Sequence, residues 1–233
     1  MSEERTASTQ LVFVRHGQPE WVRDGLNVDN PPLTELGHAQ ARRLAERLVE
    51  EHFDEILVSP LTRAAQTAAP LLEGLGRDPV EAPWLEEIRN PVWHGTPVER
   101  AEEAFRAERA RPAHRRWEGL DGGEPVRDFV ERVHRDMQLF LAERGIAPAR
   151  EDLPVWRIAE PGRKILLIAH AGTNAVAFGH LLGLQPVPWE WERFVLGHAS
   201  ISRIESLATG DGHTFSLTKL GDVEHLNLEE RTR

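Results

Sequence analysis

Three short apolar runs, each followed by a helical pattern, constrain the fold of this chain more than any other feature. They span residues 11–14, 54–59 and 164–169 and are built around Val, Ile and Leu. Runs of this kind predict interior strands of a parallel sheet, which is buried on both faces. Because strands alternate with helices, the sequence predicts an α/β fold with three α/β/α layers, in which a mostly parallel sheet is flanked by helices.

The segments after the first two strands carry start and stop signals of helices. Thr34 can cap a helix that continues through residue 52. Pro60 opens another helix, which Gly74 and Gly76 end. Both helices would return the chain to the start of the next strand, as a parallel sheet requires.

Three further helices are predicted downstream. Residues 98–111 form a charged helix of low apolar content, which is more typical of a lid than of a core. Pro125 begins a long amphipathic helix that ends near Gly145, and another helix runs from about Thr173 to Leu182. The side chains of the amphipathic helix that are predicted to face the core are Phe129, Val133, Leu139, Phe140 and Leu141.

The remaining segments predict a weak edge strand at 79–83 and a long, proline-punctuated loop at 147–163. Residues 199–206 and 213–220 alternate in polarity and predict two strands.

No repeat, low-complexity tract or clear domain boundary divides the chain. Residues 1–9 predict a disordered polar tail. Residues 10–233 predict a single domain with a helical lid around 90–122.

Composition excludes several classes of function. No apolar run approaches the ~18 residues that a membrane helix needs, and the amino-terminal segment lacks the apolar centre of a signal peptide, so we expect a cytoplasmic protein without membrane contact. The absence of cysteine excludes a disulfide, a thiolate nucleophile and a cysteine metal site. A formal net charge of −10 argues against nucleic-acid binding.

Cationic and imidazole side chains follow the predicted strands where each one ends. Arg15 and His16 come directly after the first strand, Arg63 lies in the first turn of the helix after the second, and His170 follows the third. Ligands bind at the carboxyl ends of strands in open α/β sheets, so these four side chains are expected to meet there. Two guanidiniums and two imidazoles together suit a dianionic phosphoryl group.

These residue types also suggest how a phosphoryl group could be transferred. A neutral imidazole can attack phosphorus, while the other imidazole donates to an equatorial oxygen. Glu86 and Glu87, in a loop near the site, are candidates for the acid that protonates the leaving alkoxide and then activates water. The chain carries no G-x-S-x-G, H-E-x-x-H, G-x-G-x-x-G or P-loop motif, so no metal or cofactor is expected.

Several short segments of the chain, taken in their order, resemble motifs of the histidine phosphatase superfamily, in its phosphoglycerate-mutase-like branch with an R-H-G motif. The resemblance covers roughly residues 11–226. The segments that carry it are FVRHGQPEW, PPLTELGHAQA, SPLTRAAQTA, WLEEIRNPVWHG, GGEPVRDFVERV, LIAHAGT and GDVEHL.

The resemblance implies roles for single residues. His16 would be the phosphorylated nucleophile, and Arg15, Arg63 and His170 would complete the phosphate pocket. The family alignment selects Glu87 over Glu86 as the acid.

Other positions carry weaker signals or depart from the family pattern. Gln18 occupies a position that in relatives often lies in the pocket wall. His94 replaces a family glutamate, and Pro125 replaces a serine. Trp21 and Trp93 fall in the motif loops, where they could wall an apolar substrate pocket or belong to the core.

Single histidines outside the motifs are more often structural than functional. We therefore assign His94, His180 and His198 to structural positions.

The resulting hypothesis is a metal-independent phosphomonoester hydrolase that acts through a phosphohistidine on a small phosphorylated metabolite. Two alternatives are a phosphoglycerate mutase and a non-catalytic phosphate-binding domain. Hydrolysis is favoured because Val22 stands where mutases of this family have asparagine, and because the chain has no tyrosine. The sequence carries no signal of oligomeric state.

Overall fold

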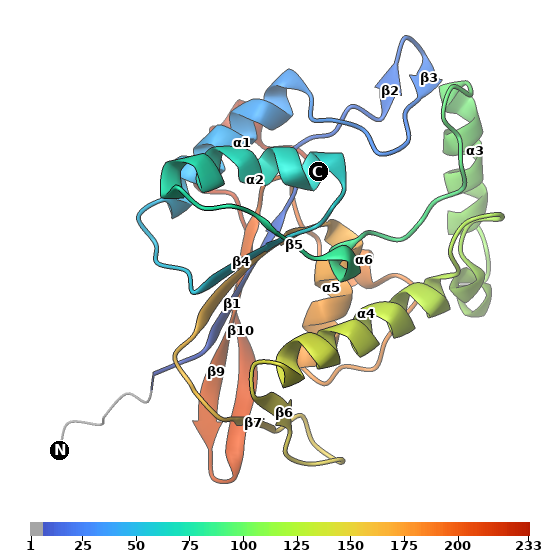
Figure 1. Ribbon diagram of the computed structural model, residues 1–233. Helices are drawn as coiled ribbons and strands as arrows, with labels where there is room; N and C mark the ends of the chain where they lie inside the picture. The colour runs from blue at the N-terminus through green and yellow to red at the C-terminus, as the bar shows by residue number, and fades with distance from the viewer. Residues whose placement is uncertain (1–6) are drawn as a thin grey trace.

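The three apolar runs form the centre of one sheet in the computed structural model, which describes residues 7–233 (Figure 1). They become β1 (Gln10–Arg15), β4 (Glu55–Val58) and β8 (Lys164–Ala169). The three strands lie side by side in the order β4–β8–β1, and all of them run parallel. Their carboxyl ends therefore meet at one edge of the sheet.

Five further strands extend this centre to an eight-stranded sheet in the order β5-β4-β8-β1-β9-β10-β7-β6. On one side β5 (Val80–Glu81) pairs in parallel with β4. On the other side β9 (Ile201–Thr209), β10 (Gly212–Asp222), β7 (Trp156–Ile158) and β6 (Ile146–Pro148) join by antiparallel pairs. The parallel half carries the strand ends at which the site residues were predicted.

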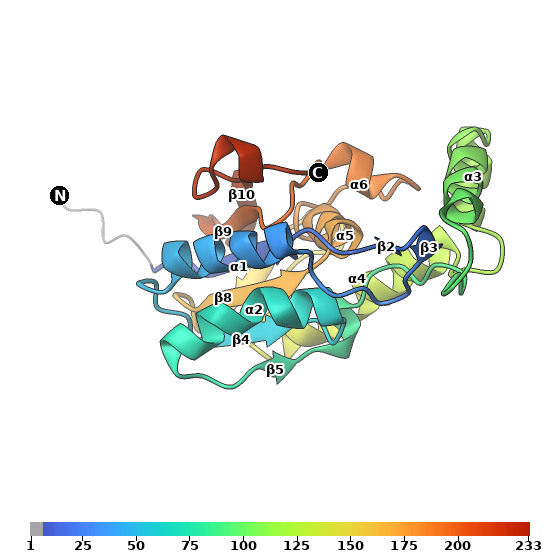
Figure 2. The ribbon, with the colours of Figure 1, turned by 90° about the horizontal axis from the view of Figure 1, so that it is seen from above.

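Helices cover both faces of the sheet, so the predicted three-layer α/β fold is confirmed (Figures 1 and 2). On one face lie α1 (Glu35–Leu48) and α2 (Thr62–Leu75). On the other lie α4 (Val126–Ala142), α5 (Ala171–Leu181) and the short α6 (Glu190–Arg193).

Side chains of the central strands alternate between the two layers. In β1, Val12 and Val14 pack into the cluster under α1 and α2, whereas Leu11 and Phe13 pack under α4 and α5. Every one of these four is at most 1% exposed. Every side chain of a strand that is buried on both faces is removed from water, which explains the continuous apolar runs.

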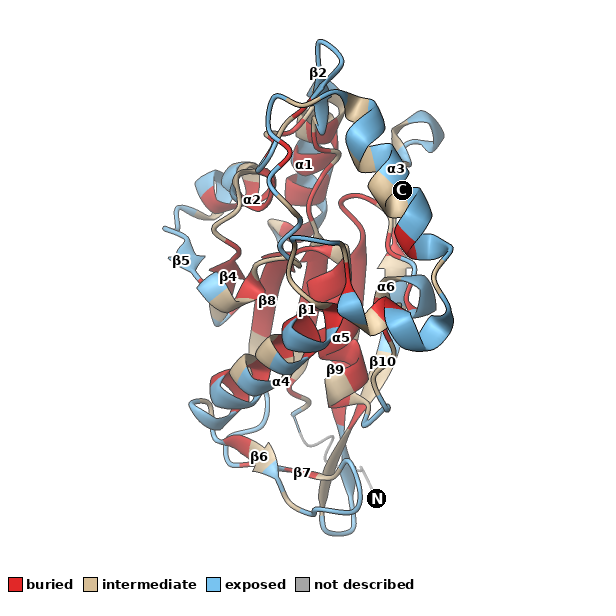
Figure 3. Ribbon diagram, turned by 90° about the vertical axis from the view of Figure 1, so that its right-hand side faces the viewer, coloured by how far each residue is buried: buried red, intermediate tan, exposed pale blue. Residues whose placement is uncertain are grey.

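The helical region predicted as a lid stands to one side of the sheet. It contains α3 (Val98–Arg109) and the 3-10 helix η2 (Ala113–Glu118), and α3 is mostly exposed (Figure 3). The hairpin of β2 (Val22–Arg23) and β3 (Leu26–Asn27) lies beside the start of α3 (Figures 1 and 2). A lid function of this region stays a prediction.

Two local predictions about the edge of the sheet and the core are wrong. The predicted loop at 147–163 contains part of β6 and all of β7, because the long strand β10 offers an edge with which Trp156 pairs opposite His213. Leu139 is 59% exposed rather than in the core. It falls outside the i, i+3, i+4 stripe of α4 that contains Met137 and Phe140.

Two boundaries also differ. The predicted tail at 1–9 includes Ser8 and Thr9, but both are held against β9. Thr9 is fully buried and its N–H donates to Ser206 Oγ at 2.9 Å, while Ser8 Oγ donates to the Ser206 carbonyl. Residues 1–6 lie outside the described residues. The helix α1 ends at Leu48, four residues before the predicted end, because the chain turns there toward β4.

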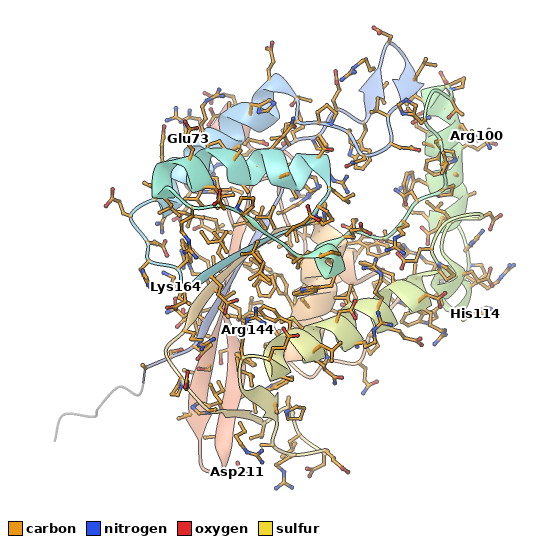
Figure 4. All side chains as sticks on the ribbon, viewed as in Figure 1. Glu73, Arg100, His114, Arg144, Lys164 and Asp211 are labelled. Atoms are coloured by element: carbon orange, nitrogen blue, oxygen red, sulfur yellow. The ribbon has the colours of Figure 1, made fainter. Side chains whose placement is uncertain are left out.

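The amino ends of the central strands carry ion pairs rather than site residues. Arg144 Nη2 lies 2.6 Å from Glu55 Oε2, and Lys164 pairs with Glu51 (Figure 4). No helix in residues 7–233 is long and apolar enough to cross a membrane.

Candidate active site

The four side chains that were expected to meet do so at the carboxyl edge of the parallel strands. Arg15 ends β1, His16 follows it, His170 follows β8, and Arg63 lies in the first turn of α2 after β4. His16 and Arg63 are 4% exposed and His170 is fully buried. The ring centres of His16 and His170 are 5.1 Å apart.

A backbone bond orients the imidazole of His16. Its Nδ1 lies 2.7 Å from the Gly17 carbonyl oxygen, which can only accept, so Nδ1 carries the proton and Nε2 keeps its lone pair. The Gly17 N–H donates to Thr67 Oγ1 at 2.9 Å, which fixes this loop against α2. Position 17 requires glycine because a Cβ there would come within 2.7 Å of the Gly37 carbonyl oxygen.

The second imidazole is held by a serine at the end of β4. Ser59 Oγ lies 2.8 Å from Nε2 of His170 and accepts from the Leu61 N–H at 3.4 Å. The serine proton is therefore available for Nε2, which leaves the ring proton of His170 on Nδ1. This Nδ1, Arg15 Nε and Arg63 Nε are buried and have no hydrogen-bond partner within residues 7–233. Buried donors of this kind suit an anion with several oxygens.

Arg15 is fixed from behind by two acceptors. Its Nη1 donates to the Leu196 carbonyl at 2.5 Å, and its Nη2 donates to Nε2 of His198 at 3.0 Å. Nδ1 of His198 in turn donates to Thr232 Oγ1 at 2.9 Å. The ring of His198 lies 5.8 Å from that of His16.

His198 is a site residue that the sequence analysis assigned to a structural position. It lies in the loop before β9, and β9 is the antiparallel neighbour of β1. The start of β9 therefore meets the end of β1. Only the pairing of these two strands, which no local pattern predicts, would have indicated this role.

The site keeps both imidazoles neutral and both guanidiniums charged. Burial holds the pKa values of His16 and His170 well below the ordinary value. The next cause is His170 for His16, and the two arginines lower both pKa values further. Burial lowers the pKa of Arg15 and Arg63 to about 10, partly opposed by Glu87. The same causes, burial and then Arg15, lower the pKa of His198 to about 3, so it accepts from Arg15 as a neutral ring.

The geometry distinguishes the two candidate carboxylates. Glu87 Oε2 accepts from the Gly172 N–H at 2.8 Å and Oε1 from the Thr173 N–H at 3.1 Å, at the amino end of α5. Glu86 instead pairs with Arg89, with Oε2 3.0 Å from Nη2. Gly172 allows the approach of Glu87, since a Cβ there would come within 2.4 Å of Glu87 Oε1. The site therefore favours Glu87 as its carboxylate.

Gln18 lies in the loop after β1, and its side chain contacts Thr34 at the start of α1. Its Oε1 accepts from Thr34 Oγ1 at 2.8 Å, and its N–H donates to Gln40 Oε1 at 2.7 Å. Gln18 thus holds the loop that follows His16, and we expect any effect on phosphate to pass through that loop.

Two clefts of about 430 Å³ each adjoin the site and share Glu87, Ile88 and Phe105 in their walls. One includes Arg15 and the other includes Arg63. Glu87 therefore belongs to the wall that the two clefts have in common.

Of the other residues that the sequence analysis named, the two tryptophans lie beside the site and two histidines lie elsewhere. Trp21 and Trp93 both line the cleft beside Arg63. His94 is exposed and accepts from the Asp29 N–H at 3.4 Å. The ring of His180, at the carboxyl end of α5, lies 4.8 Å from that of His134 at an interplanar angle of 43°.

The chain is similar to known proteins along most of its length. The family model for the histidine phosphatase superfamily (branch 1) matches residues 11–221. The probable phosphoglycerate mutase GpmB of Cronobacter sakazakii is 28% identical over 226 residues, covering 94% of this chain and 95% of that protein. Phosphoserine phosphatase 1 of Hydrogenobacter thermophilus is 32% identical over 132 residues, covering 53% of this chain and 60% of that protein.

A solved structure is similar along almost the whole chain. The mycobacterial glucosyl-3-phosphoglycerate phosphatase has a TM-score of 0.66 and 25% identity, covering 92% of this chain and 99% of its own. The proteins that this chain resembles thus carry the names of both phosphatases and mutases.

Proposed function

Because this chain belongs to branch 1 of the histidine phosphatase superfamily, we propose that it hydrolyses a small phosphomonoester through a phosphohistidine on His16. The observation that carries the proposal is the 2.7 Å bond from His16 Nδ1 to the Gly17 carbonyl. This bond leaves Nε2 as the nucleophilic atom of a neutral ring that is buried between His170 and two arginines.

In the first step, Nε2 of His16 attacks phosphorus and the bond from phosphorus to the leaving oxygen breaks. Arg15, Arg63 and His170 hold the phosphoryl oxygens, on which the negative charge resides. The Glu87 carboxyl group gives its proton to the leaving alkoxide, which departs as the alcohol.

In the second step, the Glu87 carboxylate takes a proton from water and the water oxygen attacks phosphorus. The bond between phosphorus and Nε2 breaks, which restores neutral His16 and releases inorganic phosphate. The proton that Glu87 loses in the first step is regained in the second, so the cycle is balanced.

The charges that stabilise transfer come from the chain itself. Two guanidiniums and a neutral imidazole donor face the phosphoryl position, and no group of three His, Asp or Glu side chains in residues 7–233 could hold a metal ion. We therefore propose that the reaction needs no divalent cation.

Hydrolysis is proposed over mutase activity on two grounds. Glu87 lines two clefts, and we propose that water reaches the carboxylate that would activate it through them. Val22 stands where the mutase motif has asparagine, and the chain lacks the tyrosine of the second mutase motif. A mutase must instead keep water from the phosphohistidine while its intermediate reorients.

Product analysis tests the proposal directly. The protein is incubated with 3-phosphoglycerate and 2,3-bisphosphoglycerate, and separately with p-nitrophenyl phosphate, while 2-phosphoglycerate and inorganic phosphate are measured. We expect phosphate release from p-nitrophenyl phosphate and little 2-phosphoglycerate. Efficient 2-phosphoglycerate formation with little phosphate would identify a mutase, and no turnover of any ester would favour a non-catalytic phosphate-binding domain.

A further inference from the structure

The cleft beside Arg63 has an aromatic wall that the proposed chemistry does not use. Its walls include Arg63 and Glu87 of the catalytic groups together with Trp21, Trp93 and Phe105. The cleft is thus continuous with the position where the alcohol of the substrate would leave. We refer to it as the aromatic cleft.

Trp21 is the most exposed of the three aromatic residues in this wall. Its indole is 44% exposed and lies over the guanidinium of Arg63, with 4.9 Å from Cζ to the ring centre. The contact orders the indole at the mouth of the cleft while leaving much of its surface uncovered. An indole that is held in place yet exposed offers a flat apolar surface to a ligand.

Trp93 and Phe105 form the rest of the wall. Their ring centres are 5.6 Å apart at an interplanar angle of 70°, and Trp93 is only 8% exposed. This edge-to-face pair joins the 90–97 segment to α3, so the wall is packed rather than loose.

Backbone bonds fix the two sides of the wall to each other. The Asn27 N–H donates to the Thr96 carbonyl at 2.8 Å, and the Val98 N–H donates to the Gly25 carbonyl at 3.0 Å. The hairpin that follows Trp21 and the start of α3 therefore lie side by side (Figures 1 and 2). Arg100 of α3 lies on the outer side of the helix, away from the cleft (Figure 4).

The charges of the cleft indicate what kind of alcohol it takes. Its cations are Arg63, which faces the phosphoryl group, and Arg89, which pairs with Glu86 at 3.0 Å. Asp29, Glu86 and Glu87 are its acidic residues. A leaving group with a carboxylate would therefore lose its hydration without meeting a free cation in this cleft. An uncharged group does not have this desolvation cost.

We propose that the substrate is a phosphomonoester whose alcohol carries an uncharged ring, which lies in the aromatic cleft against Trp21. The inference rests on the proposed phosphatase function. Sugar rings and aromatic rings share the property that matters, which is a flat apolar face that stacks on an indole. A short, acyclic or carboxylate-bearing alcohol would leave this wall uncovered.

Four esters of primary alcohols test the proposal, so that the leaving groups are chemically similar. Uridine 5′-monophosphate carries an aromatic base, glucose 6-phosphate carries a sugar ring, glycerol 1-phosphate has no ring, and O-phosphoserine has no ring and is charged. kcat/KM is measured for the wild type, Trp21→Ala, Trp21→Phe and Trp117→Leu. Trp117 is the matched control, because its indole also lies 4.9 Å from an arginine, Arg127, but lines neither cleft.

We expect the wild type to prefer at least one ring-bearing ester over glycerol 1-phosphate by about tenfold or more, which is a typical effect of one stacked ring. Trp21→Ala should abolish most of this preference, whereas Trp21→Phe and Trp117→Leu should retain it. The ester that is preferred, the nucleotide or the sugar phosphate, identifies the kind of ring.

Two results would overturn the inference. One is a wild type that prefers glycerol 1-phosphate or O-phosphoserine. The other is an equal loss for all four esters in Trp21→Ala, which would mean that the indole serves only to support Arg63.

Failure of the proposed function gives a different result, namely no phosphate release from any ester, including p-nitrophenyl phosphate. Calorimetric binding of uridine 5′-monophosphate, glucose 6-phosphate and glycerol 1-phosphate to the same variants would then still measure the ring preference. Equal affinities in the wild type would refute the assignment of the cleft.

Discussion

Nη2 of Arg15 donates a hydrogen bond to Nε2 of His198 across 3.0 Å, so the arginine at the end of β1 is positioned by the loop that begins β9. His198 is itself fixed by Thr232, near the other end of the chain. The position of Arg15 thus depends on three segments that are far apart in sequence.

Replacement of His198 should weaken phosphate binding. His198→Leu removes the acceptor of a charged donor, so we expect the inhibition constant of inorganic phosphate and KM to rise about tenfold or more, with a smaller effect on kcat. His198→Gln, which restores an acceptor, should recover part of the affinity. Steady-state kinetics and thermal unfolding separate this effect from a loss of folding. Unchanged phosphate affinity in a folded His198→Leu protein would exclude the positioning role.

His16→Ala should abolish the covalent route while leaving the fold intact. We expect turnover to fall by several orders of magnitude, because the nucleophile cannot be replaced by a neighbour. Base-quenched reactions, followed by mass spectrometry of the peptide that contains residue 16, should show a phosphoryl group only in the wild type. Retention of more than about a tenth of the turnover would rule out His16 as the nucleophile.

Glu87→Gln should discriminate between leaving groups. Esters of ordinary alcohols need a proton on the departing oxygen, whereas p-nitrophenolate leaves with little protonation, so the loss of kcat should be much larger for the alkyl esters. Glu86→Gln is the matched control, since that carboxylate pairs with Arg89 instead. If the control shows the leaving-group dependence and Glu87→Gln does not, the acid is Glu86.

Chelation should leave the activity unchanged. The positive charge at the phosphoryl position comes from Arg15 and Arg63, whose pKa values of about 10 keep them charged at neutral pH. We expect full turnover after exhaustive EDTA treatment and strong inhibition by vanadate, which adopts the five-coordinate geometry of the transferred group. Inactivation by EDTA with rescue by magnesium or zinc would contradict the mechanism.

Acidification should destabilise the protein through the half-buried His180. Burial, with a smaller effect of His134, lowers the pKa of His180 to about 4, whereas the unfolded chain has a pKa of about 6.5. Between these values the unfolded state binds more protons, so the free energy of unfolding falls as the pH drops through this window.

Urea unfolding of the wild type and of His180→Leu from about pH 7 to about pH 4 measures this contribution. The variant should lose less stability on acidification, by about 1–2 kcal/mol after allowance for partial solvent exposure. The exposed His114, on the outer side of η2 (Figure 4), provides the control, and His114→Leu is unfolded under the same conditions. Equal pH dependence in all three proteins would show that His180 is not the group responsible.

Local patterns were sufficient for the centre of the fold. The predicted strand at 164–169 has the same bounds as β8, and the helix capped by Thr34 begins directly after that residue. These elements follow from continuous apolar runs and from a capping side chain, which act within a few residues of sequence. The same runs end in Arg15, His16 and His170, so the carboxyl-edge rule predicted that these residues meet.

Two features of the site depended on the tertiary structure, namely the partners of the adjacent carboxylates and the role of His198. Glu86 and Glu87 are adjacent and chemically alike. The family resemblance favours Glu87, and the docking of its loop on the amino end of α5 gives the two carboxylates different partners. His198 is a single histidine without a motif, and only the pairing of β9 with β1 brings it to Arg15.

The sequence by itself therefore determined the parallel strands, the helices between them and the residues that those strands deliver to one edge, because hydrophobic periodicity and capping are local. The structure decided how the loop of Glu87 docks at that edge and which histidine supports Arg15. Those contacts join segments more than eighty residues apart. Their formation depends on strand pairing and packing across the whole domain, which no short window of sequence encodes.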